Sequence, residues 1–170
     1  MYYGILLTEN IMKNTKIKTL AEVVKIAERA RDQGLKVVTT TGCFDLVHIG
    51  HVKNLERAKS FGDVLIVGIN SDSSVKRLKG KTRPIVPARE RAEIIGSLSS
   101  VDHVFIFKEL VPTGWLAKVK PNIHVKGADR TIHEILERHL LKKIGAQLIF
   151  IPLKKGRSTS ALIEKIKKYA

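Results

Sequence analysis

The stretch that decides the fold is VVTTTGCFDLVHIGH, residues 37–51. Its opening run of Val and Thr is typical of a buried parallel strand, and Gly42 follows where the backbone must turn sharply. Apolar residues then recur with helical spacing over residues 50–61. His48 and His51 therefore lie in or beside the first turn of a helix, where unpaired backbone N–H groups and the helix dipole attract an anion. We expect that anion to be a phosphate.

Strands and helices alternate along the rest of the chain. The residue pattern predicts strands at 35–41, 64–69, 101–107, 122–126 and 147–153, and helices at 19–33, 50–61, 72–78, 88–101 and 132–144, from Pro112 and Trp115, and from Ser158 onward. Strand, helix and strand in this order imply a right-handed parallel crossover. The prediction is therefore an α/β fold: a single doubly wound, Rossmann-like domain with a five-stranded parallel sheet.

Local patterns also predict a domain boundary and two helix starts. Residues 1–18 show no clear period, so we expect an N-terminal extension, compatible with disorder, ahead of a domain at residues 19–170. Thr19 and Glu22 form a capping box for the first helix, and Asp72 is expected to cap the helix at 72–78.

The composition limits the class of protein. Lys and Arg total 31 against 16 Asp and Glu, so the net charge of +15 attracts polyanions such as nucleotides, sugar phosphates or nucleic acid. These basic residues are spread through the chain, so charge alone does not choose among the anions. Cys43 is the single cysteine, and the sequence has neither a bilayer-length apolar run nor a signal-peptide layout. We therefore expect a cytoplasmic protein without membrane association.

Four polar clusters follow predicted strands. They are residues 40–51, 70–83, 126–130 and 154–160. Ligands of doubly wound folds bind beyond the carboxyl ends of the strands. We therefore expect the four clusters to meet at one edge of the sheet, where a single anionic ligand could touch each of them.

Several of these side chains are compatible with more than one chemistry. His48 and His51 could clamp a phosphate or ligate a metal, but no third ligand has metal-type spacing, so phosphate is favoured. Cys43 could be a nucleophile, although a small buried thiol is the commoner situation. Asp45 could hold a metal or fix the turn by accepting backbone N–H bonds. The basic run at residues 76–83 could be a solvated face or a phosphate contact.

These motifs resemble those of the HxGH superfamily of nucleotidyltransferases, whose signature matches HIGH at residues 48–51. The segments NSDSSVKRLKGKTRPIVPARERAEIIGSL, VDHVFIF, VKGADR and GRSTSALIEKI are similar to those of the adenylyltransferases that make ADP-heptose from ATP and D-glycero-β-D-manno-heptose 1-phosphate. The resemblance extends from Thr19 to the C-terminus. HIGH also occurs in class I aminoacyl-tRNA synthetases, but this chain has no convincing KMSKS motif and no room for a tRNA-reading domain.

The resemblance implies a role for each matching residue. Its catalytic residues would be His48, His51 and Lys79. The histidines would bind the triphosphate and stabilise the transition state, and Lys79 would contact the α-phosphate and the attacking phosphate. The residues that would bind the nucleotide are Thr41, Gly42, Cys43, Phe44, Gly50, Arg91, Lys126, Gly127, Asp129, Ser158 and Thr159. Those that would bind the acceptor substrate are Asp45, Asn70, Asp72 and Arg83.

The chain departs from the resembled pattern at several positions. Its loop reads KGADR where heptose enzymes commonly have KGGDY, so Ala128 and Arg130 change the substrate contacts that the resemblance implies. Thr41 stands where Asn often precedes GCFD, and Ser160 stands where Thr is frequent. Leu153 occupies the position of an arginine in glycerol-phosphate cytidylyltransferases, which argues against that activity.

The activity implied by the resemblance is Mg²⁺-dependent transfer of AMP from ATP to a sugar 1-phosphate, with no metal site of the protein's own. A glycerol-phosphate cytidylyltransferase or an FAD synthetase is the alternative within the superfamily. A basic nucleic-acid-binding module is the alternative outside it, although only 5% of the residues are aromatic and no nucleic-acid motif is present. The resemblance also implies a homodimer and, because no sugar kinase is fused here, a kinase on another polypeptide.

Overall fold

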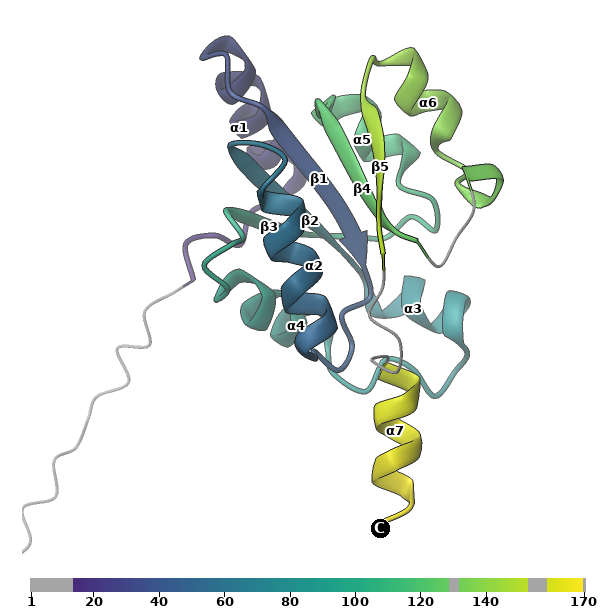
Figure 1. Ribbon diagram of the computed structural model, residues 1–170. Helices are drawn as coiled ribbons and strands as arrows, with labels where there is room; N and C mark the ends of the chain where they lie inside the picture. The colour runs from purple at the N-terminus through teal and green to yellow at the C-terminus, as the bar shows by residue number, and fades with distance from the viewer. Residues whose placement is uncertain (1–13, 129–131, 153–158, 170) are drawn as a thin grey trace, which may run out of the picture.

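The computed structural model describes residues 14–128, 132–152 and 159–169 of the chain. Within these residues, one sheet contains five strands, β1 (Val37–Gly42), β2 (Val64–Asn70), β3 (His103–Phe107), β4 (Ile123–Gly127) and β5 (Gln147–Ile151). Neighbouring strands all pair in parallel, in the order β3-β2-β1-β4-β5 (Figure 1). The predicted doubly wound α/β domain with a five-stranded parallel sheet is confirmed.

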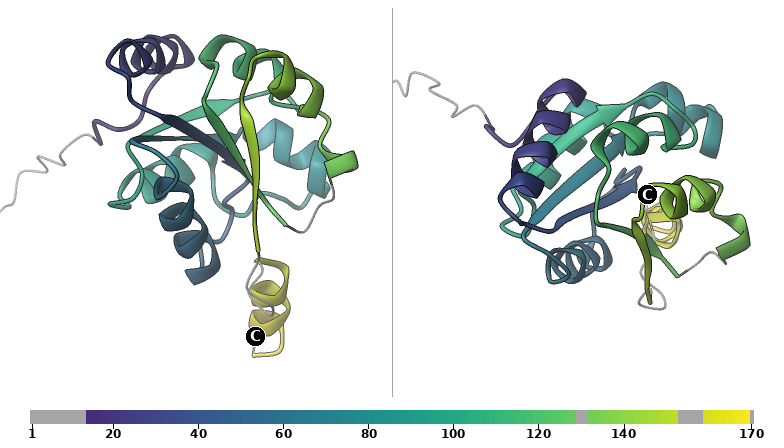
Figure 2. Two further views of the ribbon diagram at one scale, coloured as in Figure 1. Left: turned by 45° about the horizontal axis from the view of Figure 1, so that its top comes forward. Right: turned by 90° about the horizontal axis from the view of Figure 1, so that it is seen from above.

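Helices cover both faces of this sheet (Figure 2). On one face lie α2 (Ile49–Lys59) and α4 (Ala88–Gly96), and on the other lie α1 (Leu20–Asp32), α5 (Thr113–Val119) and α6 (Arg138–Lys143). Beyond the carboxyl ends of the strands lie α3 (Asp72–Lys79) and α7 (Thr159–Lys167), as Figure 1 shows. Both faces of the sheet are therefore covered, while its carboxyl edge is left for the connecting loops.

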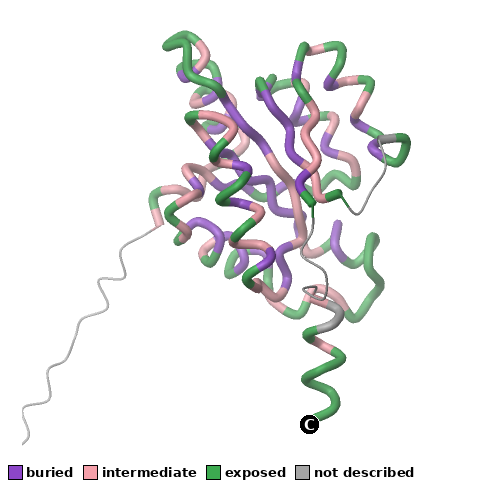
Figure 3. Tube along the Cα trace, viewed as in Figure 1, coloured by how far each residue is buried: buried purple, intermediate pink, exposed green. Residues whose placement is uncertain are grey.

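The hydrophobic core differs between the two faces. Toward α2 and α4 it is aliphatic, with Leu55 and Ile95 packed against the strands. Toward α1 and α5 it is partly aromatic, and the ring centroids of Phe105 and Trp115 lie 5.0 Å apart. Figure 3 shows β2 buried along most of its length and β1 buried over its first half. Strands buried on both faces produce continuous apolar runs, which is why the sequence pattern located them.

Two helix starts test the predicted caps. The backbone N–H of Thr19 donates to Glu22 Oε2 at 2.7 Å and that of Glu22 donates to Thr19 Oγ1 at 3.3 Å, so the predicted capping box is confirmed. The predicted cap of α3 is wrong by one residue. Ser71 caps the helix by accepting from the Ser74 backbone N–H at 3.2 Å, and Asp72 lies in the first turn.

The single helix predicted at 132–144 is wrong. The chain forms a short 3₁₀ helix, η1 (Ile132–Glu134), and then α6 (Arg138–Lys143). Between these two helices, Ile135 and Glu137 are both buried, with 2% and 4% of their surface exposed. Residues two apart point to different sides of an α-helix, so a continuous helix would not bury both side chains.

The segment just ahead of the expected domain boundary contacts the sheet. Residues 14–18, which we assigned to the N-terminal extension, dock along the outer edge of β3. The Val104 backbone N–H donates to Lys16 O at 2.9 Å, and the Lys18 N–H donates to Val104 O at 2.8 Å. Lys16 Nζ also donates to Leu98 O at 2.9 Å. This segment therefore satisfies part of an otherwise open sheet edge. Residues 1–13 lie outside the described part of the chain.

Candidate functional site

Two cavities open at the carboxyl ends of β1 and β4, which is the switch point of the sheet. The α2 cavity, about 250 Å³, is lined by Phe44, His51 and Asn54 among others. The η1 cavity, about 310 Å³, lies toward α5 and η1 and is lined by Asn70, Glu134 and Glu137 among others. The residues that line both are Thr41, Gly42, Cys43, Lys79, Lys126 and Gly127. Three of the four predicted polar clusters therefore meet at this edge.

The fourth predicted cluster falls mostly outside the described residues. Ser158 and Asp129, both predicted to bind the nucleotide, are among the residues whose structure is not described. Thr159 is described, and its hydroxyl donates to Leu46 O at 3.2 Å. The start of α7 is thereby joined to the loop that leads into α2.

The helix start at α2 fixes the two histidines in one arrangement. His48 is the N-cap, and its Nδ1 accepts from the Gly50 backbone N–H at 3.1 Å. The His48 backbone N–H in turn donates to Nδ1 of His51 at 3.3 Å. The rings stack with centroids 3.9 Å apart. Since each Nδ1 accepts a hydrogen bond, the proton of each neutral ring is on Nε2, and the His51 ring lines the α2 cavity.

His51 is neutral at physiological pH. Burial is the main cause that lowers the pKa of His51 to about 4, and the electrostatic effects of His48 and Lys79 act in the same direction. The ring of Phe44 meets it edge-on, with centroids 5.3 Å apart. His51 is therefore an uncharged hydrogen-bond donor with a fixed orientation. The positive charge that attracts a phosphate comes from the lysines of the same cavity.

The turn between β1 and α2 depends on a glycine. A Cβ atom at Gly42 would lie 2.8 Å from the Phe44 ring, so a larger residue would displace the ring that packs on His51. Phe44 itself has a positive φ of 49°, which lets the chain reverse direction tightly. The predicted nucleotide-binding residues of this turn, Gly42 to Phe44, all line the α2 cavity.

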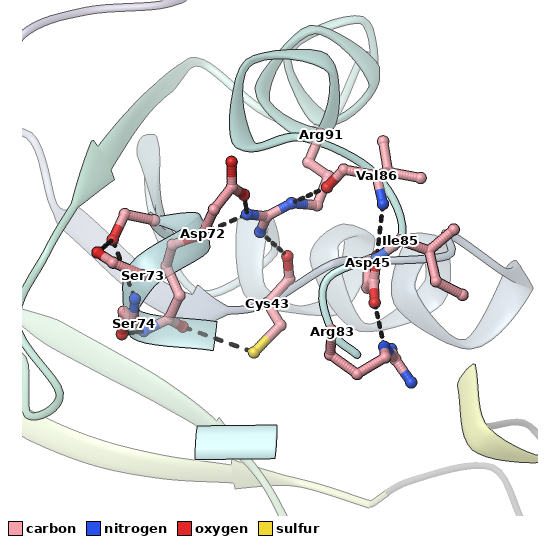
Figure 4. Close-up of polar contacts among 11 residues, drawn as sticks. Cys43, Asp45, Asp72, Ser73, Ser74, Arg83, Ile85, Val86 and Arg91 are labelled. Carbon is pink, nitrogen blue, oxygen red and sulfur yellow. Dashed lines mark hydrogen bonds and ion pairs between the residues drawn. The ribbon is translucent and has the colours of Figure 1, made fainter. Parts of the chain in front are cut away.

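Arg91 lies differently from what the sequence analysis expected. Its side chain is fully buried and lines neither cavity, so its predicted contact with nucleotide phosphates is not seen here and stays a prediction. Its guanidinium donates to backbone oxygens of Cys43, Asn70 and Val86 and to Asp72 Oδ1, the last at 2.7 Å (Figure 4). Arg91 therefore ties together the loops that follow β1 and β2 and the loop before α4.

Asp45 and Arg83, predicted to bind the acceptor, pair with each other instead. The Asp45 carboxylate accepts from Arg83 Nε and from the backbone N–H groups of Ile85 and Val86 at 2.8 and 3.0 Å (Figure 4). Burial opposes ionisation, but these hydrogen bonds and the Arg83 charge lower the pKa of Asp45. A carboxylate that accepts from three donors fastens the 80–87 loop, and its predicted contact with the acceptor stays a prediction.

Asn70 and Asp72 complete the predicted acceptor-binding set. Asp72 is paired with Arg91, as described above, although its side chain is 43% exposed. Asn70 is buried and its Nδ2 donates to Ser74 Oγ at 3.0 Å, yet it lines the η1 cavity. The structure therefore brings Asn70 to a cavity and assigns Asp72 to the scaffold.

The remaining candidates at the cavities are a thiol and two lysines. Burial raises the pKa of the Cys43 thiol, and the nearby Lys79 and Arg91 cations only partly oppose that shift, so the thiol is protonated. Lys79 is the last residue of α3 and is exposed. The Nζ of Lys126 donates a hydrogen bond to Thr41 Oγ1 at 2.9 Å. Both lysines line both cavities, where their ammonium groups can meet an anion.

Comparison with known proteins decides the family. The cytidylyltransferase-like family matches residues 39–165, which is most of the chain and includes most of β1 and all of β2, β3, β4 and β5. The chain belongs to the cytidylyltransferase-like family. Its matched region contains the histidine pair, both lysines and the two cavities described above.

Two relatives of this cytidylyltransferase-like chain are bifunctional proteins. It is 41% identical over 155 residues to the bifunctional protein HldE of Geobacter sulfurreducens and 44% identical over 153 residues to HldE of Aliarcobacter butzleri. The matches cover 91% and 90% of this chain but 32% and 31% of those proteins. The chain therefore spans about a third of the length of these relatives.

Solved structures agree with the cytidylyltransferase-like fold. The lipopolysaccharide core biosynthesis protein from Thermoplasma volcanium GSS1 has a TM-score of 0.60 at 31% identity, over 72% of this chain and 98% of that one. The pantoate-beta-alanine ligase from Francisella tularensis, solved with beta-gamma ATP and beta-alanine, also has a TM-score of 0.60, at 20% identity over 85% of this chain and 68% of that one. The second likeness is one of fold alone.

Sequence reasoning missed some residues of this cytidylyltransferase-like site. Asn54 lies three residues after His51 on α2 and lines the same cavity, so helical spacing alone could have predicted it. Glu137 gave no such signal, because it fell within a helix that does not form as predicted. Over the described ranges no helix is long and apolar enough to cross a membrane, and no three His, Cys, Asp or Glu side chains gather as metal ligands would.

Proposed function

We propose that this chain transfers AMP from ATP to D-glycero-β-D-manno-heptose 1-phosphate, forming ADP-heptose and releasing pyrophosphate. The observation that carries the proposal is the character of the α2 cavity. It gathers a neutral N–H donor, His51, with two ammonium groups, Lys79 and Lys126, at the switch point of a nucleotide-binding fold. The similarity to HldE and the segments shared with ADP-heptose-forming enzymes support the choice of acceptor.

The chemistry needs donors rather than a base. A sugar 1-phosphate oxygen is already anionic, so it can attack the α-phosphorus of ATP in line while pyrophosphate leaves. Catalysis then depends on holding the two phosphates together and on stabilising charge that develops on the α-phosphate oxygens. The Nε2–H groups of His48 and His51 supply hydrogen bonds, and Lys79 supplies positive charge. The protonated Cys43 thiol takes no part in this scheme.

The two cavities suggest how the substrates divide. We assign the triphosphate to the α2 cavity, beside the histidines, and the sugar phosphate to the η1 cavity. The η1 cavity offers an amide from Asn70 and a carboxylate from Glu134, which are groups that bind hydroxyls. Lys79 and Lys126 line both cavities, so they lie where the reacting phosphates would meet.

Mg²⁺ would enter as the ATP complex. The donor set fits this role, because the carboxylates of Asp45 and Asp72 near the site are already paired with arginines. Triphosphate oxygens and water would therefore be its main ligands. When bound, the ion neutralises charge on the pyrophosphate that leaves. The proposal also includes a cytoplasmic location, a homodimer and a sugar kinase that makes the acceptor.

Pyrophosphate release across ATP and CTP, each with several phosphorylated acceptors, tests the proposal. We expect turnover with ATP and heptose 1-phosphate, and much slower release with CTP or glycerol 3-phosphate. A preference for CTP with glycerol 3-phosphate would replace the proposal with a cytidylyltransferase. Tight, steeply salt-dependent binding of a short RNA or DNA without any nucleotide turnover would replace it with a nucleic-acid-binding role.

A further inference from the structure

A line of polar side chains crosses an otherwise apolar face of the sheet. Side chains alternate along a strand, so Thr39 and Thr41 of β1 and His124 and Lys126 of β4 lie on the same face, toward α5 and α6. Thr39 pairs with His124 in the parallel register. Buried polar groups in an aromatic core cost free energy unless they are satisfied, so their presence here requires an explanation.

His124 is the innermost member of this line. It is fully buried, its Nδ1 lies 2.8 Å from Thr39 Oγ1, and its ring meets Trp115 edge-on. Burial lowers the pKa of His124 to about 4, so the ring is neutral. The Thr39 hydroxyl also donates to Ile123 O at 3.4 Å, and His124 Nε2, on the other side of the ring, lies 3.7 Å from Glu137 Oε1.

Glu137 links this buried pair to the cavities. Its carboxylate is 4% exposed, and its Oε1 lies 2.6 Å from Lys126 Nζ. Burial by itself would raise the pKa of Glu137, but the His124 ring and the Lys126 charge outweigh it and hold the pKa at about 2. Lys126 Nζ also donates to Thr41 Oγ1 at 2.9 Å, so two acceptors from different elements fix the ammonium at the wall that both cavities share.

We propose that Glu137 is a positioning residue that holds the Lys126 ammonium at the meeting point of the two cavities, with the buried His124 ring beside its carboxylate. The inference rests on the proposed function, in which Lys126 meets the ATP phosphates. A lysine side chain is flexible and loses substantial rotamer entropy when it is ordered. Anchoring it before the substrate arrives moves that cost from the binding step to folding.

The local fold is consistent with this role. The chain interrupts the helix predicted at 132–144 and thereby turns both Ile135 and Glu137 inward. A buried ion pair is a weak source of stability, because desolvation of both charges offsets their attraction. Stability alone is therefore a poor reason to bury Glu137 beside Lys126, and the placement of the ammonium at the cavity wall is a better one.

The test is a double-mutant cycle in ATP affinity and turnover. Glu137→Gln keeps the size of the side chain and removes its charge, and we expect it to raise the KM for ATP and the Kd for a non-hydrolysable ATP analogue about tenfold. Lys126→Met removes the ammonium itself. If Glu137 acts through Lys126, Glu137→Gln adds less than about twofold in the Lys126→Met background.

The matched control is Glu56→Gln. Glu56 also pairs with a lysine, Lys53 at 2.8 Å, but both side chains are exposed on α2 away from the cavities. We expect ATP affinity and turnover to be unchanged in this variant. If Glu137→Gln does not fold, Glu137→Asp keeps the charge and shortens the reach, and we expect it to raise the same Kd about threefold.

Calorimetric binding of the ATP analogue needs no acceptor. It therefore tests the positioning role of Glu137 separately from the proposed transfer to heptose 1-phosphate. Wild-type binding without heptose 1-phosphate turnover would overturn the proposed function and leave the cycle measurable. Losses that multiply in the double variant, or an unchanged Kd in both Glu137→Gln and Glu137→Asp, would overturn the positioning role. A wild-type chain that does not bind the analogue would overturn both.

Discussion

Two sets of charged side chains lie at the carboxyl edge of the sheet and differ in what they face. Arg91 and Asp45 are turned into the protein, where each accepts or donates several hydrogen bonds that join neighbouring loops. Lys79 and Lys126 line the two cavities, beside His51. Charged residues from the family motifs therefore form two groups. Arg91 and Asp45 hold the loops together, and Lys79 and Lys126 face the cavities where substrates would bind. We expect their variants to separate stability from catalysis.

Removal of a donor should give the largest effect on turnover. Lys79→Ala deletes a cation that lines both cavities, and we expect kcat/KM to fall about a hundredfold or more, or about 2.7–4 kcal/mol in the barrier by analogy with an oxyanion-hole donor. Steady-state pyrophosphate release measures the loss, and the thermal midpoint should stay close to that of the wild type. Lys81→Ala, in the same exposed basic run, is the control and should keep normal turnover. Near-normal turnover of folded Lys79→Ala would exclude this lysine from the mechanism.

Removal of the scaffold arginine should act mainly on stability. Arg91→Ala leaves the carbonyl oxygens of Cys43, Asn70 and Val86 without their donor, and we expect the free energy of unfolding to fall by about 3 kcal/mol. Urea unfolding measures it. Arg89→Ala is the control, because Arg89 is exposed and lies two residues earlier on the same helix. A variant as stable as the wild type, with turnover lost, would return Arg91 to the substrate-binding set.

Loss of the Asp45 carboxylate should lower the free energy of unfolding less than loss of Arg91. Asp45→Asn keeps the shape but loses the charge that accepts from Arg83 and two backbone N–H groups, and we expect a loss of about 1.5–3 kcal/mol in unfolding free energy. The KM of each substrate should change little at temperatures where the variant is folded. A large rise in the KM for the sugar phosphate at unchanged stability would show that Asp45 binds the acceptor after all.

Stability should also depend on pH. His124 and His51 have pKa values lowered to about 4 in the folded protein, against 6.5 ordinarily, so folding favours their neutral forms. Their contribution is fully present above about pH 6.5 and is lost as the pH falls toward 4, at most about 1.4 kcal/mol per pH unit for each histidine. Thermal midpoints between pH 7 and 4.5 measure it. His124→Asn should show a shallower dependence than the wild type, and an equal slope would contradict the assignment.

The sequence predicted the sheet and its carboxyl edge because both depend on strong local patterns. Apolar runs such as residues 64–69 identify strands buried on both faces, and alternation with helices makes the strands parallel. The position of the histidine pair was predictable for a similar reason. A helix that starts within HIGH places His48 and His51 at its first turn. The break in the 132–144 helix was not predictable, because it depends on burial of Ile135 and Glu137 against distant strands.

The roles of individual charges were the least predictable part. A motif gives the position of Arg91 in the chain but not the direction of its side chain, which is decided by three carbonyl groups from separate loops. The same holds for Asp45, whose partners lie about 40 residues later in the sequence. Contacts of that range appear only once the loops are folded together, so sequence spacing could not distinguish scaffold charges from substrate-facing ones.

The central claim is that a nucleotidyl group, rather than a terminal phosphoryl group, moves at the α2 cavity. The most direct measurement follows radioactive phosphorus from ATP labelled at either the α- or the γ-position, with heptose 1-phosphate and Mg²⁺ present. The account predicts that the α-label enters the sugar nucleotide and that the γ-label is released as pyrophosphate. A γ-label on the sugar, or an α-label that stays in ADP or ATP, would contradict it.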